Sequence, residues 1–198
     1  TVLLYTRFFE YELERLWRIV RRIRELRPEV RLVVVGEGFA GEETVLLEMG
    51  RRAGWRVGHS ATDVPELDLL YAGWGTASTL SWTFEVAHVA VYPFDDTLLN
   101  RTKCPMKLMD LLSSGLPVVA DRVGQINEAV VHGKTGLLVA CGDDRAFAQS
   151  ALMLLEDPDR RRRMGMAARS DVARRFGWDR LAETAMAAYE YAMARPSE

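Results

Sequence analysis

Short runs of apolar residues alternate along the chain with longer stretches in which apolar positions recur every three or four residues. The short runs predict buried strands, because several are rich in β-branched residues and end at Gly or Pro. These strands are expected at 2–6, 31–35, 67–72, 89–92, 117–120 and 137–139. Between them, the spacing predicts amphipathic helices at 11–27, 42–53, 78–87, 104–114 and 125–131. Such alternation is typical of α/β folds with a parallel sheet.

After residue 139 the strand pattern stops and only helical patterns remain. Three further helices are expected, containing residues 147–155, 159–175 and 178–194. No internal repeat or linker divides the chain. We therefore expect a single domain over residues 1–198. Its predicted fold is a Rossmann-like, doubly wound, six-stranded parallel sheet with a helical tail over about 143–198.

Composition excludes several classes of protein. The 198 residues are 48% hydrophobic and 27% charged, which rules out a disordered or collagen-like chain. No apolar run approaches the roughly 18 residues that a membrane span requires. The net charge of −2 gives no overall attraction to nucleic acid, so we expect no nucleic-acid partner.

The cysteines and histidines predict neither a disulfide framework nor a metal site. Cys104 and Cys141 are the two cysteines, and neither has a metal-ligand spacing to a histidine. A reducing cytoplasm is therefore the expected compartment. The sequence runs from Thr1 directly into the apolar residues 2–5, which leads us to expect that it is one domain of a longer protein.

A glycine pattern, Gly36-Glu-Gly38-Phe-Ala-Gly41, follows the second expected strand. A G-x-G-x-x-G segment between a strand and a helix is the fingerprint of dinucleotide binding. That mechanism also needs a ribose-binding carboxylate about 20 residues further on. Residues 54–59 contain none, and the next is Asp63. A tight turn is the favoured interpretation, and an NAD- or FAD-dependent oxidoreductase domain that uses Gly36–Gly41 is an alternative function.

Further motifs in the chain are more specific. In order, they are Arg7 after the first strand, Val-Gly36-Glu-Gly38, Tyr71-Ala-Gly73-Trp74, Pro105-Met-Lys-Leu-Met-Asp110, Asp121-Arg-Val-Gly-Gln-Ile-Asn-Glu128 and His132-Gly-Lys-Thr-Gly136. This order resembles the C-terminal, nucleotide-sugar-binding domain of the GT-B glycosyltransferases of family 4, the group 1 transferases. The resemblance covers nearly the whole chain.

The resemblance implies transfer of a sugar from a nucleoside diphosphate sugar, with retention of anomeric configuration. It also implies that this domain binds the donor without a metal or cofactor. The acceptor, a glycan, polysaccharide or glycolipid, would bind an N-terminal domain outside these residues. The whole protein would act in the cytoplasm or, by peripheral association, at the inner face of the membrane. A degenerate GT-B domain kept as an inactive binding module is a further alternative.

The resemblance assigns roles to individual residues. Arg7 matches the family arginine that contacts the donor phosphates. Asp110 aligns with the second glutamate of the E-x7-E motif, which contacts the ribose, whereas Thr102 stands in place of the first. The lysine usual about five residues after the arginine is missing from the segment 8–12. The resemblance assigns no catalytic residue here.

Helix geometry points to the same region. At 100° per residue, Lys103, Lys107 and Asp110 fall on one face of the expected helix 104–114, whose start attracts phosphate. We predict that the donor diphosphate lies between Arg7 and this helix start, with Lys107 as its cation and Asp110 at the ribose. A solvated Lys107–Asp110 ion pair is the alternative. The candidate donor-binding residues are Arg7, Gly36, Gly38, Gly73, Trp74, Thr102, Lys103, Lys107 and Asp110.

Overall fold

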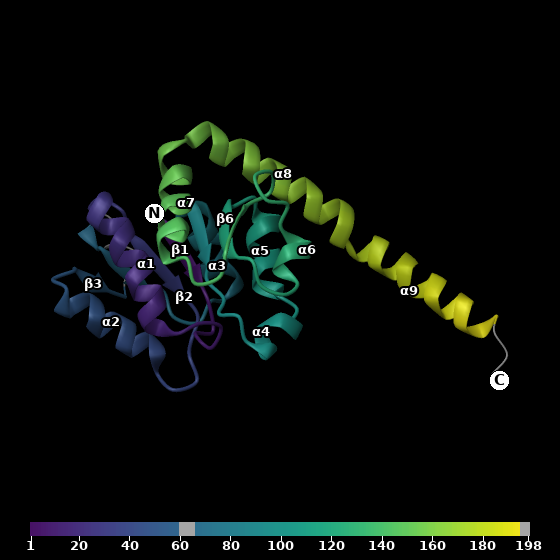
Figure 1. Cartoon of the computed structure of the whole chain (residues 1–198), viewed down its shortest axis with the longest axis horizontal. Coiled ribbons are helices and arrows are strands. Elements are labelled where there is room, and N and C mark those ends of the chain that lie inside the picture. The colour runs from purple at the N-terminus through teal and green to yellow at the C-terminus, as the bar shows by residue number, and fades with distance from the viewer. Residues whose placement is uncertain (60–65, 195–198) are drawn as a thin grey trace.

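The computed structural model describes residues 1–59 and 66–194. Seven parallel strands form one sheet in the order β3-β4-β2-β1-β5-β6-β7 (Figure 1). They are β1 Val2–Tyr5, β2 Leu32–Val35, β3 Val57–Gly58, β4 Leu69–Tyr71, β5 Val89–Tyr92, β6 Val118–Asp121 and β7 Leu137–Val139. The six predicted strands are all present. The expected count of six was wrong, because β3 is a two-residue edge strand, too short to give a sequence pattern.

The helices lie close to the predicted positions. They are α1 Leu13–Leu26, α2 Glu42–Arg52, α3 Ala77–Val86, α4 Leu98–Thr102, α5 Met106–Ser114, α6 Ile126–Ala129, α7 Asp144–Glu156, α8 Pro158–Phe176 and α9 Trp178–Met193. The short α4 was not predicted. Pro105 is the N-cap of α5, so this helix starts two residues later than expected. Lys103 therefore lies outside α5, as the C-cap residue of α4, which corrects the predicted helical stripe.

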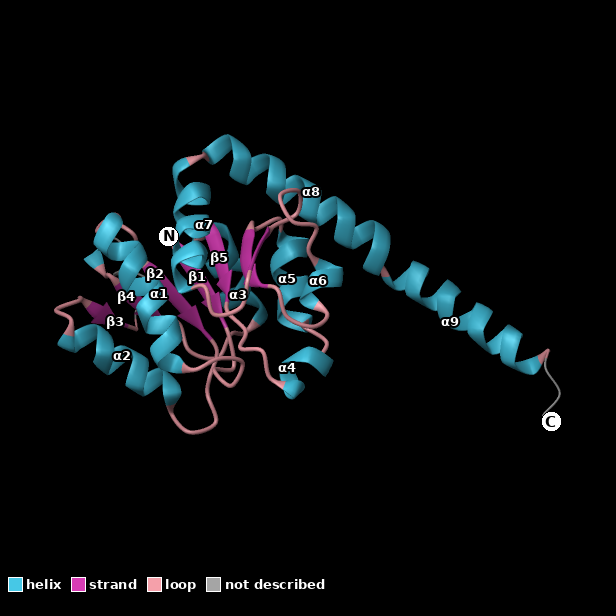
Figure 2. Cartoon of the chain, in the orientation of Figure 1, coloured by secondary structure: helices cyan, strands magenta, loops and turns pink. Residues whose placement is uncertain are grey.

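Helices cover both faces of the sheet, as the doubly wound fold class predicts (Figure 2). Successive strand residues point to opposite faces. Leu4 and Val34 pack in one layer with buried residues of α1, α2 and α7. Leu3 and Val33 pack in the other layer, with residues of α3, α5, α6 and α8. Two apolar layers therefore hold the strands between them, and the loops at the strand ends remain available for a site.

The chain changes direction at β1, which lies in the middle of the sheet. Leu3 pairs with Val33 of β2 on one side and with Ala90 of β5 on the other. From β1 the chain passes through α1 to β2, whereas from β5 it passes to β6 on the opposite side. Open α/β sheets bind their ligands outside the carboxyl ends of the strands at such a switch point. The loops after β1 and β5 are therefore the expected place for a site.

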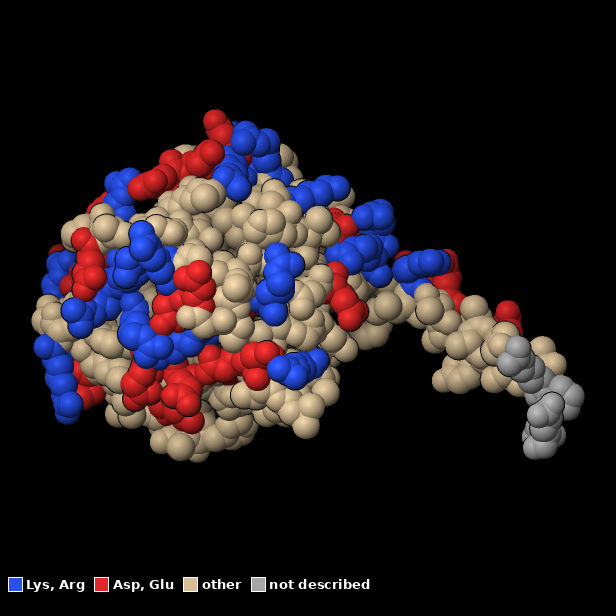
Figure 3. Space-filling model, in the orientation of Figure 1, with Lys and Arg blue, Asp and Glu red and all other residues tan. Residues whose placement is uncertain are grey.

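The C-terminal helices behave differently from each other. α8 packs against α5, where its Gly165 meets the carbonyl oxygen of Gly115. α9 extends away from the body of the molecule and buries no residue (Figure 1). In Figure 3 its outer part shows mostly uncharged side chains. Residues 195–198 of the expected tail lie outside the described residues. None of the described helices is long and apolar enough to cross a membrane.

Candidate functional site

The loop that follows β1 makes a tight turn at Phe8. Its φ of 67° is in the left-handed region, which bulky residues rarely occupy, and its ring is buried. The Phe8 amide donates a 2.8 Å hydrogen bond to Oγ1 of Thr6, at the end of the strand. This turn directs the side chain of Glu10 inward, where it is only 2% exposed. A charged residue is thus buried directly at the carboxyl end of β1.

The Glu10 carboxylate joins the loop after β1 to the segment that follows β5. Its Oε1 atom accepts from Nζ of Lys103 at 2.8 Å and from Nζ of Lys107 at 2.9 Å. Its Oε2 atom accepts from Oγ1 of Thr6 at 3.2 Å and from the Arg7 amide at 3.3 Å. Burial opposes ionisation, but Lys107 and Lys103 outweigh it and lower the pKa of Glu10. An ionised carboxylate therefore spans the switch point.

The two lysines that meet at Glu10 differ in their surroundings. Nζ of Lys103 lies 4.0 Å from the ring centroid of Phe9 and 5.1 Å from that of Phe94. Burial lowers the pKa of Lys103, and the Glu10 carboxylate opposes that change. Nζ of Lys107 contacts no charged group except Glu10 among residues 1–59 and 66–194. Lys107 consequently keeps donors that a ligand could use.

The Arg7 guanidinium lies between two aromatic rings. Its Cζ atom is 4.6 Å from the ring centroid of Phe39 and 4.6 Å from that of Trp74. Its Nε atom is buried without a hydrogen-bond partner, and the group forms no ion pair within the described part of the chain. A guanidinium that stacks through its faces keeps its N–H donors in the plane, where they can bind a phosphate through two hydrogen bonds. The structure thus leaves Arg7 ready for an anion.

Asp110 and Thr102 lie near this cluster without joining it. Asp110 is on α5, three residues after Lys107, and its carboxylate makes no hydrogen bond to another described residue. The alternative of a Lys107–Asp110 ion pair is wrong, because Lys107 turns to the buried Glu10 instead. Partial burial raises the pKa of Asp110, and Lys107 opposes this. Thr102 donates to the carbonyl oxygen of Leu98 within α4.

The glycine turn has a structural explanation. At Gly36, where φ is 129°, a Cβ atom would overlap the carbonyl oxygen of Thr6, so the ends of β1 and β2 can approach only with glycine there. The Gly36 amide donates to the carbonyl oxygen of Gly73 at 2.9 Å. The turn therefore ties together the ends of β1, β2 and β4.

The N–H groups of this turn are occupied by carboxylates of α2. The Gly38 amide donates to Glu43 at 3.0 Å and the Ala40 amide to Glu42 at 2.8 Å. A dinucleotide pyrophosphate would need such N–H groups at the helix start. Two acidic side chains there would also repel it. The geometry disfavours the dinucleotide interpretation. Asp63, the first carboxylate after residues 54–59, lies outside the described residues. A donor contact at Gly36 or Gly38 stays a prediction.

The buried Arg15 stabilises the loops that carry the site. Arg15 binds Asp121 at 2.8 Å, Asp95 at 3.0 Å and Asp144 at 2.9 Å. Asp95 in turn accepts from the Glu12 amide at 2.6 Å, and its own amide donates to the carbonyl oxygen of Glu10 at 2.9 Å. Arg15 thus fixes the loop after β5, and this loop fixes the loop after β1.

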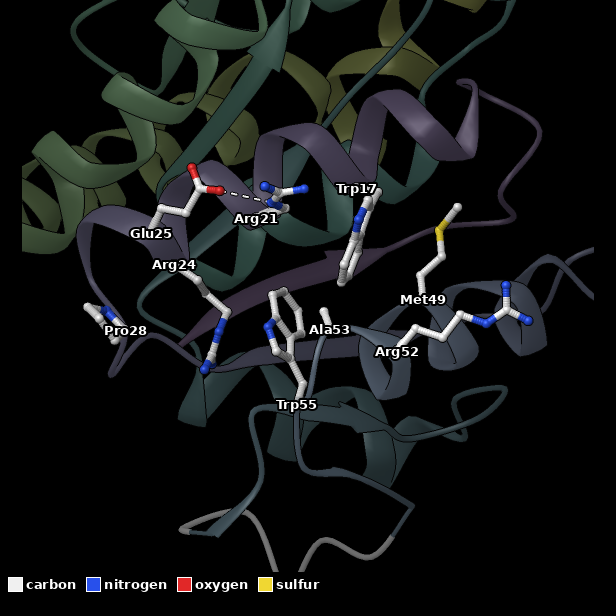
Figure 4. Close-up of a pocket in the computed structure, with 9 residues that line it drawn as sticks. All are labelled: Trp17, Arg21, Arg24, Glu25, Pro28, Met49, Arg52, Ala53 and Trp55. Atoms are coloured by element: carbon white, nitrogen blue, oxygen red, sulfur yellow. Dashed lines mark hydrogen bonds and ion pairs between the residues drawn. The ribbon is translucent and has the colours of Figure 1, made fainter.

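A separate pocket lies between α1 and α2 (Figure 4). Trp17 and Trp55 line it with ring centroids 4.7 Å apart. The arginines there are engaged in ion pairs, such as Arg21 with Glu25 at 2.8 Å. None of the predicted donor-binding residues lines this pocket, so it does not belong to the candidate site. Within the described ranges, no group of three or more acidic, Cys or His side chains could hold a metal ion.

The structure brings together Arg7, Trp74, Lys103 and Lys107 of the predicted site, directly or through Glu10. Sequence reasoning missed Glu10 and Phe39. Glu10 lies within the segment 8–12, from which the lysine usual in the family is missing. A carboxylate in that segment was a signal that could have pointed to Glu10. The exposed Phe39 within a glycine turn was another.

Comparisons with known proteins identify the family of this chain. Residues 1–157 match the family model described as glycosyl transferases group 1. The D-inositol 3-phosphate glycosyltransferase of Pseudarthrobacter chlorophenolicus is 31% identical over 176 residues, which cover 87% of this chain and 38% of that protein. The chain thus spans well under half the length of this relative.

Solved structures share the fold. The C-terminal domain of a group 1 family glycosyl transferase (LpcC) from Francisella tularensis has a TM-score of 0.68 at 15% identity, covering 89% of this chain and 86% of that one. Anabaena Alr3699/HepE, solved with UDP and glucose, has a TM-score of 0.72 at 18% identity, covering 94% of this chain and 48% of that one. By its sequence and its fold, the chain belongs to the group 1 glycosyltransferase family.

Proposed function

We propose that this chain is the donor-binding domain of a retaining glycosyltransferase, which moves a sugar from a nucleoside diphosphate sugar to an acceptor. Membership of the group 1 family supports sugar transfer. The similarity to an isolated C-terminal domain, most of whose length this chain covers, supports the assignment to the donor half. The complex of Anabaena Alr3699/HepE with UDP and glucose supports a nucleoside diphosphate as the ligand class.

The observation that carries the proposal is the Arg7 guanidinium at the switch point, which no described residue binds in an ion pair. A leaving nucleoside diphosphate develops negative charge, which a fixed cation stabilises without a metal ion. Arg7 would bind one phosphate through two hydrogen bonds, and Lys107 would add a point charge at the start of α5. No metal and no cofactor is needed in this arrangement.

The rest of the donor would extend along neighbouring side chains. Asp110, three residues from Lys107, has a carboxylate available to accept hydrogen bonds from ribose hydroxyls. The exposed rings of Trp74 and Phe39 offer flat surfaces beside the base. The acceptor, a glycan, polysaccharide or glycolipid, would bind a second domain outside these 198 residues.

Thermal unfolding with a panel of ligands tests this proposal. A ligand at 100 times its Kd stabilises the folded form by about 2.7 kcal/mol. For a domain of this size, that raises the Tm by about 5–10 °C. We expect this shift with at least one of UDP, GDP, ADP or their sugars, and little change with NAD or FAD. A shift with NAD or FAD alone would favour the oxidoreductase alternative, and no shift with any nucleotide would favour an inactive binding module.

A further inference from the structure

We infer that Glu10 is a positioning residue, which holds Lys107 of α5 against the donor diphosphate and so replaces a cation missing from the loop after β1. This inference rests on the proposed function. The loop after β1 supplies one cation, Arg7, and then a buried carboxylate, Glu10, within the segment 8–12 where a second cation was expected. The second cation comes instead from α5, the second helix after β5.

The charges at Glu10 do not balance, and the imbalance favours an anion. One carboxylate faces two ammonium groups at 2.8 and 2.9 Å. Lys103 lies beside the rings of Phe9 and Phe94, and its side chain is 19% exposed. Lys107 has no such ring contact among the described residues, and its side chain is 15% exposed. Glu10 neutralises one of the two ammonium groups, so the other one, together with Arg7, gives this cluster of four side chains a net positive charge.

Glu10 is held firmly enough to fix its partners. Its side chain is buried, and Oε2 is anchored by the Thr6 hydroxyl and the Arg7 amide. The Thr6 hydroxyl is itself fixed by hydrogen bonds from the Phe8 amide and the Tyr11 hydroxyl. A flexible lysine that is already held in place loses less conformational freedom when a phosphate binds. Preorganisation of this kind is how a buried carboxylate can improve the binding of an anion.

The Glu10 carboxylate contacts both Arg7 and Lys107. One oxygen binds the backbone amide of Arg7, and the other binds the ammonium of Lys107. Glu10 therefore holds the backbone of Arg7 and the ammonium of Lys107, while the rings of Phe39 and Trp74 hold the Arg7 guanidinium, before any donor arrives. A diphosphate, which has two phosphates to satisfy, fits such a pair better than a single phosphate does.

Calorimetric titration with UDP, GDP and ADP, and with their nucleosides, tests this inference on the whole chain. Lys107→Met should weaken binding of the preferred nucleoside diphosphate about 10- to 100-fold and leave the nucleoside unchanged. Glu10→Gln removes a negative charge, so charge alone predicts tighter binding. Positioning predicts the opposite, a loss of about 10-fold. The double variant should bind as Lys107→Met does, since Glu10 acts through Lys107.

Lys134→Met is the matched control, because this exposed lysine precedes β7 at the amino edge of the sheet and should leave binding unchanged. Glu10→Asp, with a shorter arm, should give an intermediate loss and decides the matter if Glu10→Gln does not fold. Wild-type binding with unchanged or tighter binding by the Glu10 variants would overturn the inference alone. Losses that multiply in the double variant would do the same. No binding of any nucleotide by the wild type would overturn the proposed function and the inference with it.

Discussion

The Lys107 ammonium lies 2.9 Å from the Glu10 carboxylate. This contact joins two residues that are 97 positions apart in the sequence. The contact crosses the point where the sheet changes direction, between the loop after β1 and α5. It holds an ammonium group in a preformed position at the carboxyl edge of the sheet. The stability of the fold and the binding of an anion should therefore both depend on Glu10.

Glu10→Gln should destabilise the fold at neutral pH. The substitution keeps the shape of the side chain and leaves two partly buried lysines without their carboxylate. Removal of one partner from a buried ion pair costs about 3–5 kcal/mol. Urea unfolding at pH 7 measures this loss. A loss below about 1 kcal/mol would mean that water solvates both lysines well enough without Glu10.

The stability gap between the wild type and Glu10→Gln should depend on pH. Because the folded state lowers the pKa of Glu10 from its ordinary 4.5, the carboxylate stabilises the fold fully above that value. Its contribution is lost as the pH falls through the lower, folded pKa. The gap should therefore be constant between about pH 5 and 7 and shrink below about pH 4.5. A gap that widens on acidification would contradict the lowered pKa.

Arg15→Met should destabilise the fold by about 3–5 kcal/mol, because it leaves the fully buried Asp121 carboxylate without a cation. Arg18→Met is the matched control. Arg18 also binds Asp144, at 2.9 Å, but its side chain is 61% exposed. Its loss should cost at most about 1 kcal/mol. Equal losses for the two variants would show that burial does not decide the strength of these ion pairs.

Gly165→Ala should destabilise the fold although alanine is the better helix former. A Cβ atom at this position of α8 would overlap the carbonyl oxygen of Gly115, which is backbone and cannot rotate away. Overpacking of this kind costs about 1–3 kcal/mol. Ser170→Ala, on an exposed position of the same helix, should change the free energy of unfolding by less than about 0.5 kcal/mol. A stabilised Gly165→Ala variant would refute the close approach of α5 and α8.

Truncation after Gly177 should leave the Tm nearly unchanged. The deletion removes α9, which buries none of its residues on the rest of the chain. A shift of no more than about 2 °C in thermal unfolding is expected. A large fall in Tm would show that α9 packs on the body of the domain.

The sequence patterns predicted most of the fold because each major element carries its own local signal. Buried strands such as β1 and β2 are continuous apolar runs. The two-residue β3 and the five-residue α4 are too short to show a period. The start of α5 depends on Pro105, whose ring excludes it from the helix interior. The expected helix began at residue 104 and its polar face was extended back to Lys103, which lies outside α5.

The candidate site was only partly predictable. Family motifs pointed to Arg7, and helix geometry pointed to Lys107, since both signals are local. The role of Glu10 depends on a left-handed turn at Phe8 and on two lysines more than 90 residues away. No local pattern contains such a contact. Glu42 and Glu43 directly follow Gly41 in the sequence, but the glycine pattern does not show that these carboxylates bind the amides of the turn.

The central claim, that the carboxyl edge of β1 binds the diphosphate of a nucleotide sugar, is tested most directly by Arg7→Met. Methionine can still lie between Phe39 and Trp74, whereas the charge is lost. Calorimetric titration should show one nucleoside diphosphate binding more tightly than its nucleoside to the wild type. Arg7→Met should reduce that affinity about 10- to 100-fold and leave the nucleoside unaffected. Equal affinities for diphosphate and nucleoside, or an Arg7→Met variant that binds the diphosphate as the wild type does, would contradict the claim.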